Sequence, residues 1–125
     1  MTENEISKEL VNIFFKIHNS LGPGLMESVY EYAICHELDK SGIKYCRQKE
    51  IQVYYDYLNM GLGFRADIIV MEKIIVEIKS IEHIAPVHSK QLLTYLKLTN
   101  LKLGLLVNFN EVLIKDGIIR IANKL

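Results

Sequence analysis

Apolar side chains recur at steps of three and four residues along the first forty positions, which is the period of one helix face. The first stripe predicts a helix from about Glu3 to Ser20. The run Leu21-Gly22-Pro23-Gly24 interrupts the pattern, and a second helix is predicted from about Leu25 to Ser41, which Gly42 is well placed to end. The first stripe consists of Ile6, Leu10, Ile13, Phe14, Ile17 and Leu21.

Beyond Gly42 the pattern becomes one of extended structure. Lys44 to Tyr55 is rich in β-branched and aromatic residues, and Asp56 to Gly63 carries turn residues. Two further strands are predicted, from Phe64 to Val70 and from Ile74 to Lys79. Only the tight turn Met71-Glu72-Lys73 separates them, so they can pair as a hairpin.

The last third of the chain returns to helix and strand. Pro86 suits the first turn of a helix that runs to about Thr99, because its missing amide hydrogen is not needed there. Leu101 to Phe109 predicts a buried strand, and Val112 to Ile121 a hairpin around Asp116-Gly117. Because the middle strands are apolar on both faces, the expected fold class is α/β, with a mixed central sheet flanked by helices.

Three charged residues interrupt the two central apolar strands. Asp67 lies in the first of them, and Glu77 and Lys79 lie in the second. Side chains alternate along a strand, so Glu77 and Lys79 share one face, and Asp67 can lie beside them in a hairpin. Burying charge is costly unless the charge is paired or binds a metal.

Two interpretations of this triplet stay open at the level of sequence. Lys79 could neutralise Glu77 or Asp67 in a structural ion pair. Alternatively, the two carboxylates could bind a divalent cation such as Mg²⁺, which takes oxygen ligands from one or two acids, water and phosphate. Lys79 would then orient the attacking water or stabilise developing charge. Two acids and one base fit the cation site better, because an ion pair needs only one acid.

Composition narrows the classes of protein. A length of 125 residues predicts one compact domain, residues 1–125. Fifteen basic residues balance fifteen acidic ones, so no strongly basic surface announces nucleic-acid binding. Two cysteines form neither a disulfide framework nor a four-thiolate iron–sulfur cluster. The acidic N-terminus is unlike a signal peptide, and no apolar run suits a membrane span. These features predict a cytoplasmic protein without membrane association.

The acidic triplet, followed by a helix and a strand, resembles the PD-(D/E)xK nuclease superfamily, whose restriction-endonuclease-like core is α-β-β-β-α-β. Ala66 stands where the family name has proline. The run Gly24-Leu25-Met26-Glu27-Ser28-Val29-Tyr30 matches the pattern of the GxxExxY branch. Gln91 and Tyr95 match the QxxxY motif of RecB-type and lambda-exonuclease-type relatives. The resemblance covers roughly Ile6 to Phe109.

The resemblance implies roles for six residues besides Lys79. It makes Asp67 and Glu77 metal ligands, with Glu27 as a further ligand of metal or metal-bound water. Alternatively, Glu27 could only stabilise its helix, because an acidic side chain in the first turn interacts favourably with the helix dipole. Gln91 would hydrogen-bond metal-bound water or phosphate. Tyr95 and His88, on the same helical stripe, would contact substrate; the alternatives are packing for Tyr95 and a polar seam for His88.

The expected function is therefore a Mg²⁺-dependent nuclease, with Mn²⁺ as a possible substitute, that hydrolyses phosphodiester bonds of DNA. Glu27, Asp67, Glu77, Lys79 and Gln91 would form its catalytic set. The alternative is a non-catalytic nucleic-acid-binding or protein-interaction module that retains the nuclease fold. Neutral overall charge suggests weak DNA binding by the isolated chain, which a homodimer or partner protein could strengthen.

Overall fold

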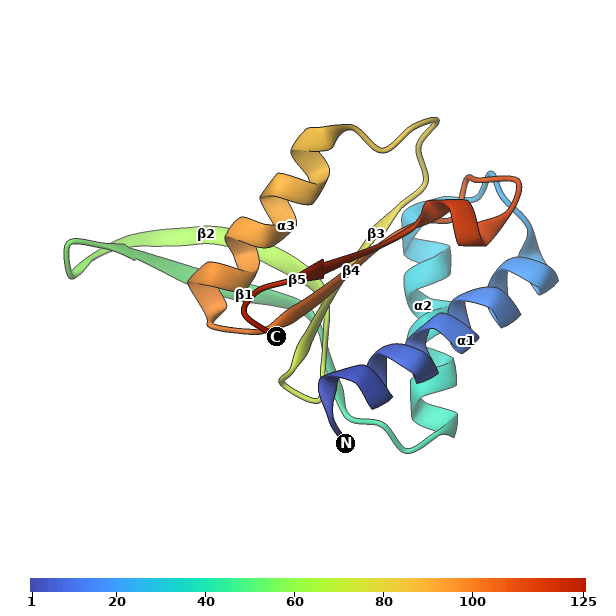
Figure 1. Ribbon diagram of the computed structural model, residues 1–125, viewed down its shortest axis with the longest axis horizontal. Coiled ribbons are helices and arrows are strands. Elements are labelled where there is room, and N and C mark those ends of the chain that lie inside the picture. Colours follow the sequence, from blue (N-terminus) through green and yellow to red (C-terminus); the bar gives the residue numbers. More distant parts are fainter.

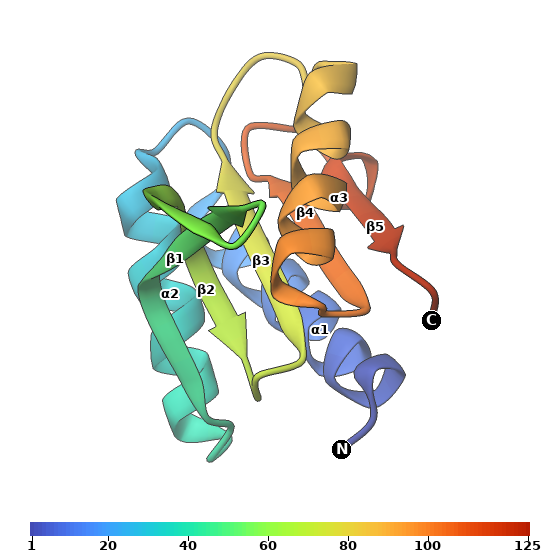
Figure 2. The same ribbon diagram turned by 90° about the vertical axis from the view of Figure 1, so that its left-hand side faces the viewer.

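The computed structural model describes residues 1–125 and contains one five-stranded sheet between two helical layers (Figure 1). Helices α1 and α2 lie on one side of the sheet and α3 lies on the other (Figure 2). The elements are α1 (Glu3–Leu21), α2 (Glu27–Lys40), β1 (Tyr45–Tyr55), β2 (Leu58–Val70), β3 (Ile74–Lys79), α3 (Pro86–Thr99), β4 (Leu103–Asn108), the 3₁₀ turn η1 (Ile114–Gly117) and β5 (Ile118–Ala122).

The sheet is mixed, with strands in the order β1-β2-β3-β4-β5. Strands β1, β2 and β3 form an antiparallel meander, and β4 and β5 are also antiparallel. Between them β3 and β4 are parallel, because α3 carries the chain back across the sheet. The predicted α/β class and the α-β-β-β-α-β order are therefore confirmed.

Two apolar layers hold the sheet and helices together. The larger contains 20 buried residues and fills the space between α1, α2 and the sheet, including Ile6, Leu10 and Phe14 of the predicted stripe. The smaller lies under α3 and is built around Leu92 and Leu96. Strand β3 contributes to both layers, which explains why its sequence is apolar on both faces.

The second helix begins later than expected. It starts at Glu27 rather than Leu25, and it follows an extended Met26. Tyr30 is fully buried, and its hydroxyl donates to the Gly22 carbonyl at 2.6 Å and accepts from the Leu25 amide at 3.1 Å. These two bonds hold residues 22–25 outside the helix, so α2 can begin only after them.

The C-terminal pair of strands differs in detail from the predicted hairpin around Asp116-Gly117. Those two residues lie in η1, and β5 pairs antiparallel with β4 instead of with a strand before the turn. Ile114 is buried in the larger core layer, which draws this segment inward. A side chain at Gly117 would meet the Asn108 carbonyl oxygen at 2.4 Å, so the close approach requires glycine.

The β1–β2 hairpin is much longer than the sequence suggested. The expected turn region from Asp56 to Gly63 is wrong: only Asp56 and Tyr57 form the turn, and β2 begins at Leu58. Residues 52–62, here called the arm, extend away from the body (Figure 1). Tyr54 and Tyr55 are exposed in the arm. No helix has the length and apolar character needed to cross a bilayer.

Candidate active site

Asp67 and Glu77 face each other where strands β2 and β3 separate. The two strands pair only as far as Ile68 opposite Val76. Beyond this point the Asp67 carboxylate accepts a hydrogen bond from the Ile78 amide at 2.9 Å. The Glu77 carboxylate in turn accepts a longer one from the Asp67 amide at 3.4 Å. Each acid therefore takes a backbone donor that the sheet leaves free, and both carboxylates are brought to the same fork.

Burial makes this pair electrostatically costly. The Glu77 residue is only 9% exposed, and burial together with the nearby Asp67 charge raises the pKa of its carboxyl to about 8. Burial also raises the pKa of Asp67; the Ile78 amide opposes that shift and the charge of Glu31 adds to it. Two carboxylates thus share a site with too little positive charge nearby, which is the setting that a bound cation relieves.

Lys79 follows Glu77 by two residues on β3 and is half-buried. Its charge lowers the pKa of both Asp67 and Glu77. It takes part in none of the ion pairs of the structure. The structural ion pair that the sequence left open is not formed, and the ammonium group remains free beside the two acids.

Glu27 reaches the end of β3 from the first turn of α2. Its carboxylate accepts a hydrogen bond from the Ser80 amide at 3.0 Å, directly after Lys79. The Ser80 hydroxyl donates to the Leu25 carbonyl at 2.6 Å, so the segment before α2 is docked on the same strand end. Glu27 is exposed rather than packed on the sheet. The glycine, glutamate and tyrosine of the Gly24–Tyr30 motif thus share one structural unit, in which Tyr30 holds the loop and Glu27 joins it to β3.

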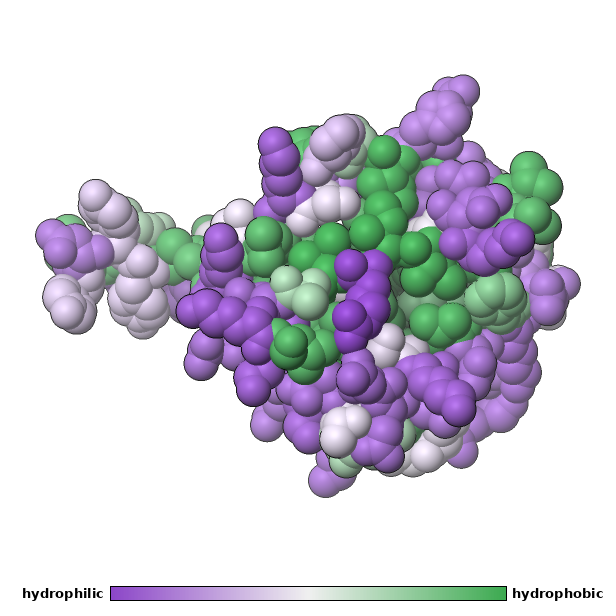
Figure 3. Space-filling model, in the orientation of Figure 1, coloured by the Kyte–Doolittle hydropathy of each residue, from purple (hydrophilic) through white to green (hydrophobic).

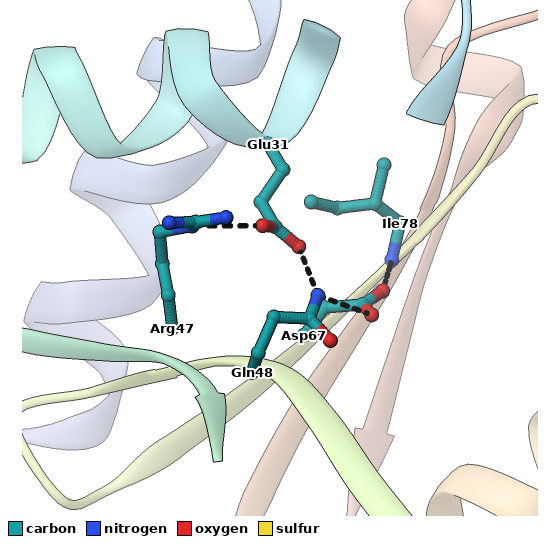
Figure 4. Close-up of polar contacts among 5 residues, drawn as sticks. All are labelled: Glu31, Arg47, Gln48, Asp67 and Ile78. Atoms are coloured by element: carbon teal, nitrogen blue, oxygen red, sulfur yellow. Dashed lines mark hydrogen bonds and ion pairs between the residues drawn. The ribbon is translucent and has the colours of Figure 1, made fainter. Parts of the chain in front are cut away.

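Glu31 was not singled out from the sequence, yet it is the most buried acid near Asp67. It is 5% exposed, and its carboxylate accepts from Arg47 Nε at 2.8 Å and from Gln48 Nε2 at 2.6 Å (Figure 4). The same Gln48 nitrogen lies 3.5 Å from Asp67 Oδ1. The available signal was spacing: Glu31 lies four residues after Glu27 and so on the same helix face.

Gln48 owes its position to an irregularity in β1. Arg47 pairs with Ile68 and Lys49 with Ala66, while Gln48 lies between these pairs with a φ of 49°. The register is the same on both sides of Gln48, so no residue is inserted, and its positive φ alone turns the side chain out of the regular alternation. The Gln48 side chain points toward both Glu31 and Asp67, so it links helix α2 to the acidic fork (Figure 4).

The three predicted residues of α3 occupy different environments. Tyr95 is half-buried and stacks on Phe64, with ring centroids 3.8 Å apart. Burial and then the charges of Glu77 and Asp67 raise the Tyr95 pKa, so its hydroxyl senses the acidic fork. Gln91 is exposed and makes no side-chain hydrogen bond within the chain. His88 Nδ1 accepts from the Ala85 amide at 3.0 Å, which caps the start of α3.

The donor set suits a hard divalent cation, because carboxylate oxygens are the ligands that Mg²⁺ prefers. As the side chains lie, no three histidine, cysteine or carboxylate groups are close enough together to form a complete metal centre. Asp67 and Glu77 provide two adjacent carboxylates, and Mg²⁺ commonly retains several waters with only one or two protein ligands. The residues present therefore fit the cation, with Glu27 at the margin of the fork.

Comparison with known proteins agrees with this geometry. The family model of the PD-(D/E)XK nuclease superfamily matches residues 4–121. The chain belongs to the PD-(D/E)XK nuclease superfamily. Searches of curated proteins and of solved structures found no significant match. Members of this superfamily are typically metal-dependent and act on nucleic acid. In the PD-(D/E)XK pattern, Glu77-Ile78-Lys79 reads as (D/E)XK and Asp67 as the preceding acid, with Ala66 in place of proline.

Proposed function

We propose that this PD-(D/E)XK protein is a Mg²⁺-dependent nuclease of the GxxExxY branch that hydrolyses phosphodiester bonds of DNA. The observation that carries the proposal is the fork between β2 and β3, where Asp67 and Glu77 meet and Lys79 makes no ion pair. A site that served only structure would use its lysine to neutralise an acid. Here the lysine is left available for chemistry.

Asp67 and Glu77 would hold the cation, Mg²⁺ or in its place Mn²⁺, with Glu27 as a further ligand through water. When bound, the cation polarises a phosphate oxygen and lowers the pKa of its water. Lys79 places its ammonium group beside the two acids, where it orients the attacking water and stabilises negative charge on the phosphate. Glu31 acts through Gln48, which restrains the Asp67 carboxylate.

The substrate side of the site falls to α3. Tyr95 lies close enough to the acids for their charges to raise its pKa, which supports a contact with the phosphate backbone. Gln91 is one turn earlier on the same helix and has its amide free for substrate or metal-bound water. His88 is assigned to substrate only through Nε2, because Nδ1 already accepts the Ala85 amide.

Cleavage of labelled DNA tests the proposal directly. Purified protein is incubated with single-stranded and double-stranded DNA, and with RNA, in Mg²⁺ or Mn²⁺. We expect DNA cleavage that requires metal and is lost in Lys79→Ala. Lys8→Ala is the matched control, because Lys8 is an exposed lysine on α1.

Two outcomes would reject the enzyme. Wild type that cuts no nucleic acid with any divalent cation, or Lys79→Ala that cuts as fast as wild type, contradicts a working active site. Binding of DNA without cleavage would favour the alternative, a non-catalytic module that retains the nuclease fold. Circular dichroism of each variant shows that any loss of cleavage is not a loss of folding.

A further inference from the structure

The arm exposes most of its large apolar side chains to solvent. Tyr55 is 74% exposed and Tyr57 is 98% exposed at its tip. Figure 3 shows the arm standing clear of the body, so no other segment covers it. Its remaining exposed apolar residues are Tyr54, Leu58, Met60 and Leu62.

The turn at the tip is built at a conformational cost. Asp56 and Tyr57 have φ angles of 52° and 66°, the left-handed geometry of a two-residue hairpin turn. Asp56 tolerates this region, but the second position is normally glycine. A bulky aromatic with positive φ is unfavourable, although Met71 and Glu72 in the β2–β3 turn adopt the same geometry. Tyr57 is 98% exposed, so its ring gains little from packing within the chain.

The arm has a defined apolar face. The side chains of Ile51, Val53 and Tyr55 all point to one side of β1, because every second residue of a strand faces the same way. The register shifts near them do not disturb this order, since their extra residues lie in β2. Ile51 packs against the core layer under α3, so this is the α3 side of the sheet. Leu58 pairs with Tyr55 across the turn and lies on the same face. Tyr54 points to the opposite side.

The same face of the sheet holds an uncovered groove at the base of the arm. It has a volume of about 1240 Å³. Its apolar lining includes Ile51 and Ile69 of the sheet and Leu101, which follows the end of α3. Helix α3 lies over the β4 and β5 side of the sheet (Figure 2). One chain therefore carries both an apolar arm without a partner and an apolar groove without an occupant.

Charge argues against nucleic acid as the partner of the arm. Residues 51–64, which include the whole arm, contain no lysine or arginine, and Asp56 is their only charge. Such a segment is not suited to DNA phosphates, which are bound by cations. Lys49 lines the groove next to Ile51, and Lys44 lines its edge. Neither lysine nor Asp56 makes an ion pair within the chain. Two acids, Asp39 and Glu72, also line the groove.

We propose that the arm and groove form the interface of a two-fold homodimer, in which each arm lies in the groove of the other copy. The Val53, Tyr55 and Leu58 face packs on the apolar lining of the partner's groove, and the tip brings Asp56 toward the partner's lysines. A two-fold axis makes both contacts at once, because each copy supplies one arm and one groove. The dimer needs neither metal nor nucleic acid, so it stands or falls independently of nuclease activity.

Sedimentation velocity of the metal-free chain tests the proposal. We expect dimer at protein concentrations up to about 100 µM, where a micromolar Kd gives mostly dimer. Tyr55→Ser/Leu58→Ser should raise the dimer Kd at least about tenfold, because it removes the buried anchors. Tyr54→Ser is the matched control, a tyrosine 62% exposed on the other face of the same strand. It should change the Kd less than about twofold.

Charge exchange tests the pairing of arm and groove. Asp56→Lys and Lys49→Glu should each weaken the dimer, and an equal mixture of the two variants should restore it. In the mixed dimer, one arm–groove contact pairs the new lysine with the new glutamate. The other contact keeps the native Asp56 and Lys49. Restoration in the mixture is therefore specific to contacts between an arm and the partner's groove.

Cross-linking gives a readout that does not depend on affinity. Cys46 is an exposed thiol that lines the groove, whereas Cys35 is buried. Tyr57→Cys should form a disulfide-linked dimer under mild oxidation with diamide, and Tyr57→Cys/Cys46→Ser should not. Wild type that is monomeric throughout, or a dimer that tolerates Tyr55→Ser/Leu58→Ser, overturns the proposal. So does an arm variant that loses only DNA binding, which would assign the arm to nucleic acid.

Discussion

At the scale of single residues, the site depends on a few carboxylates held against their electrostatic preference. Asp67 and Glu77 accept backbone amides that would otherwise lack partners at the end of the β2–β3 ladder. Those bonds fix the carboxylates but do not neutralise them. Glu31 is different, because Arg47 and Gln48 satisfy both of its oxygens. The unneutralised pair is therefore the one expected to bind a cation.

Removal of one carboxylate from the pair should weaken metal binding. We expect Asp67→Asn to lower Mn²⁺ affinity by at least about tenfold, because affinity follows the number of charged ligands. Isothermal titration calorimetry measures it. Asp116→Asn is the control, because Asp116 is exposed in η1 and distant in sequence from the fork. Equal affinity in Asp67→Asn and wild type would place the metal elsewhere.

The raised pKa of Glu77 should make the metal-free protein less stable as pH rises. Its carboxyl titrates at about 8 when folded, against a reference value of 4.5. Between these values the folded state holds a proton that the unfolded state has released. The contribution of Glu77 to the free energy of unfolding is therefore fully present below pH 4.5 and is lost as the pH rises toward 8. The slope cannot exceed about 1.4 kcal/mol per pH unit for one proton.

Urea denaturation in EDTA at several pH values between these limits measures this slope. Glu77→Gln carries no titrating carboxyl and should flatten it. A wild-type stability that is level or rises across the same range would show that Glu77 is already ionised in the fold.

At the scale of elements, the start of α2 and the end of β3 act as one unit. Tyr30 holds residues 22–25 in place, and Glu27 and Leu25 both bond to Ser80. The placement of Glu27 beside the active-site strand thus depends on a buried hydroxyl in the next helical turn. This dependence gives a physical reason for the glutamate and the tyrosine to occur at fixed spacing.

Tyr30→Phe should therefore destabilise the protein by about 1–3 kcal/mol, because the Leu25 amide loses its partner and the Gly22 carbonyl loses its donor. Thermal unfolding measures the loss. Tyr32→Phe is the matched control on the same helix, since Tyr32 is 60% exposed. If the two variants have the same Tm, the Tyr30 hydroxyl does not hold this loop.

At the scale of the whole molecule, a net charge of zero conceals an uneven distribution. Four acids, Glu27, Glu31, Asp67 and Glu77, approach one end of the sheet from α2, β2 and β3. Arg47 and Lys79 are the nearby cations, and Arg47 is already paired with Glu31. The fold therefore concentrates negative charge that the composition as a whole does not reveal.

A divalent cation that binds this fork should raise the Tm of wild type. At a free concentration about 100 times its Kd, it stabilises the folded state by about 2.7 kcal/mol. Differential scanning calorimetry with MgCl₂, compared with NaCl at equal ionic strength, separates binding from screening. Asp67→Asn/Glu77→Gln should show no Mg²⁺-specific rise, and a rise equal to that of wild type would contradict a metal site at the fork.

The sequence by itself determined the order of helices and strands from α1 to β4, the α/β class and the acidic triplet. These features follow from local periodicity, because the spacing of apolar residues depends on which faces a segment buries. Ile6, Leu10 and Phe14 indicated α1, and the run Ile74–Lys79, apolar on both faces, indicated β3. The converging Asp67 and Glu77 were also predictable, because a hairpin turn of three residues leaves few registers.

Only the tertiary structure decided what depends on contacts between distant segments. Glu31 joins the site because Gln48, with its positive φ, reaches it from β1, and no local pattern in the sequence of β1 predicts that backbone conformation. The arm extends because β1 and β2 continue pairing past the body, where burial no longer constrains residue choice. Lys79 makes no ion pair although two carboxylates lie near it, and only the folded geometry decides that.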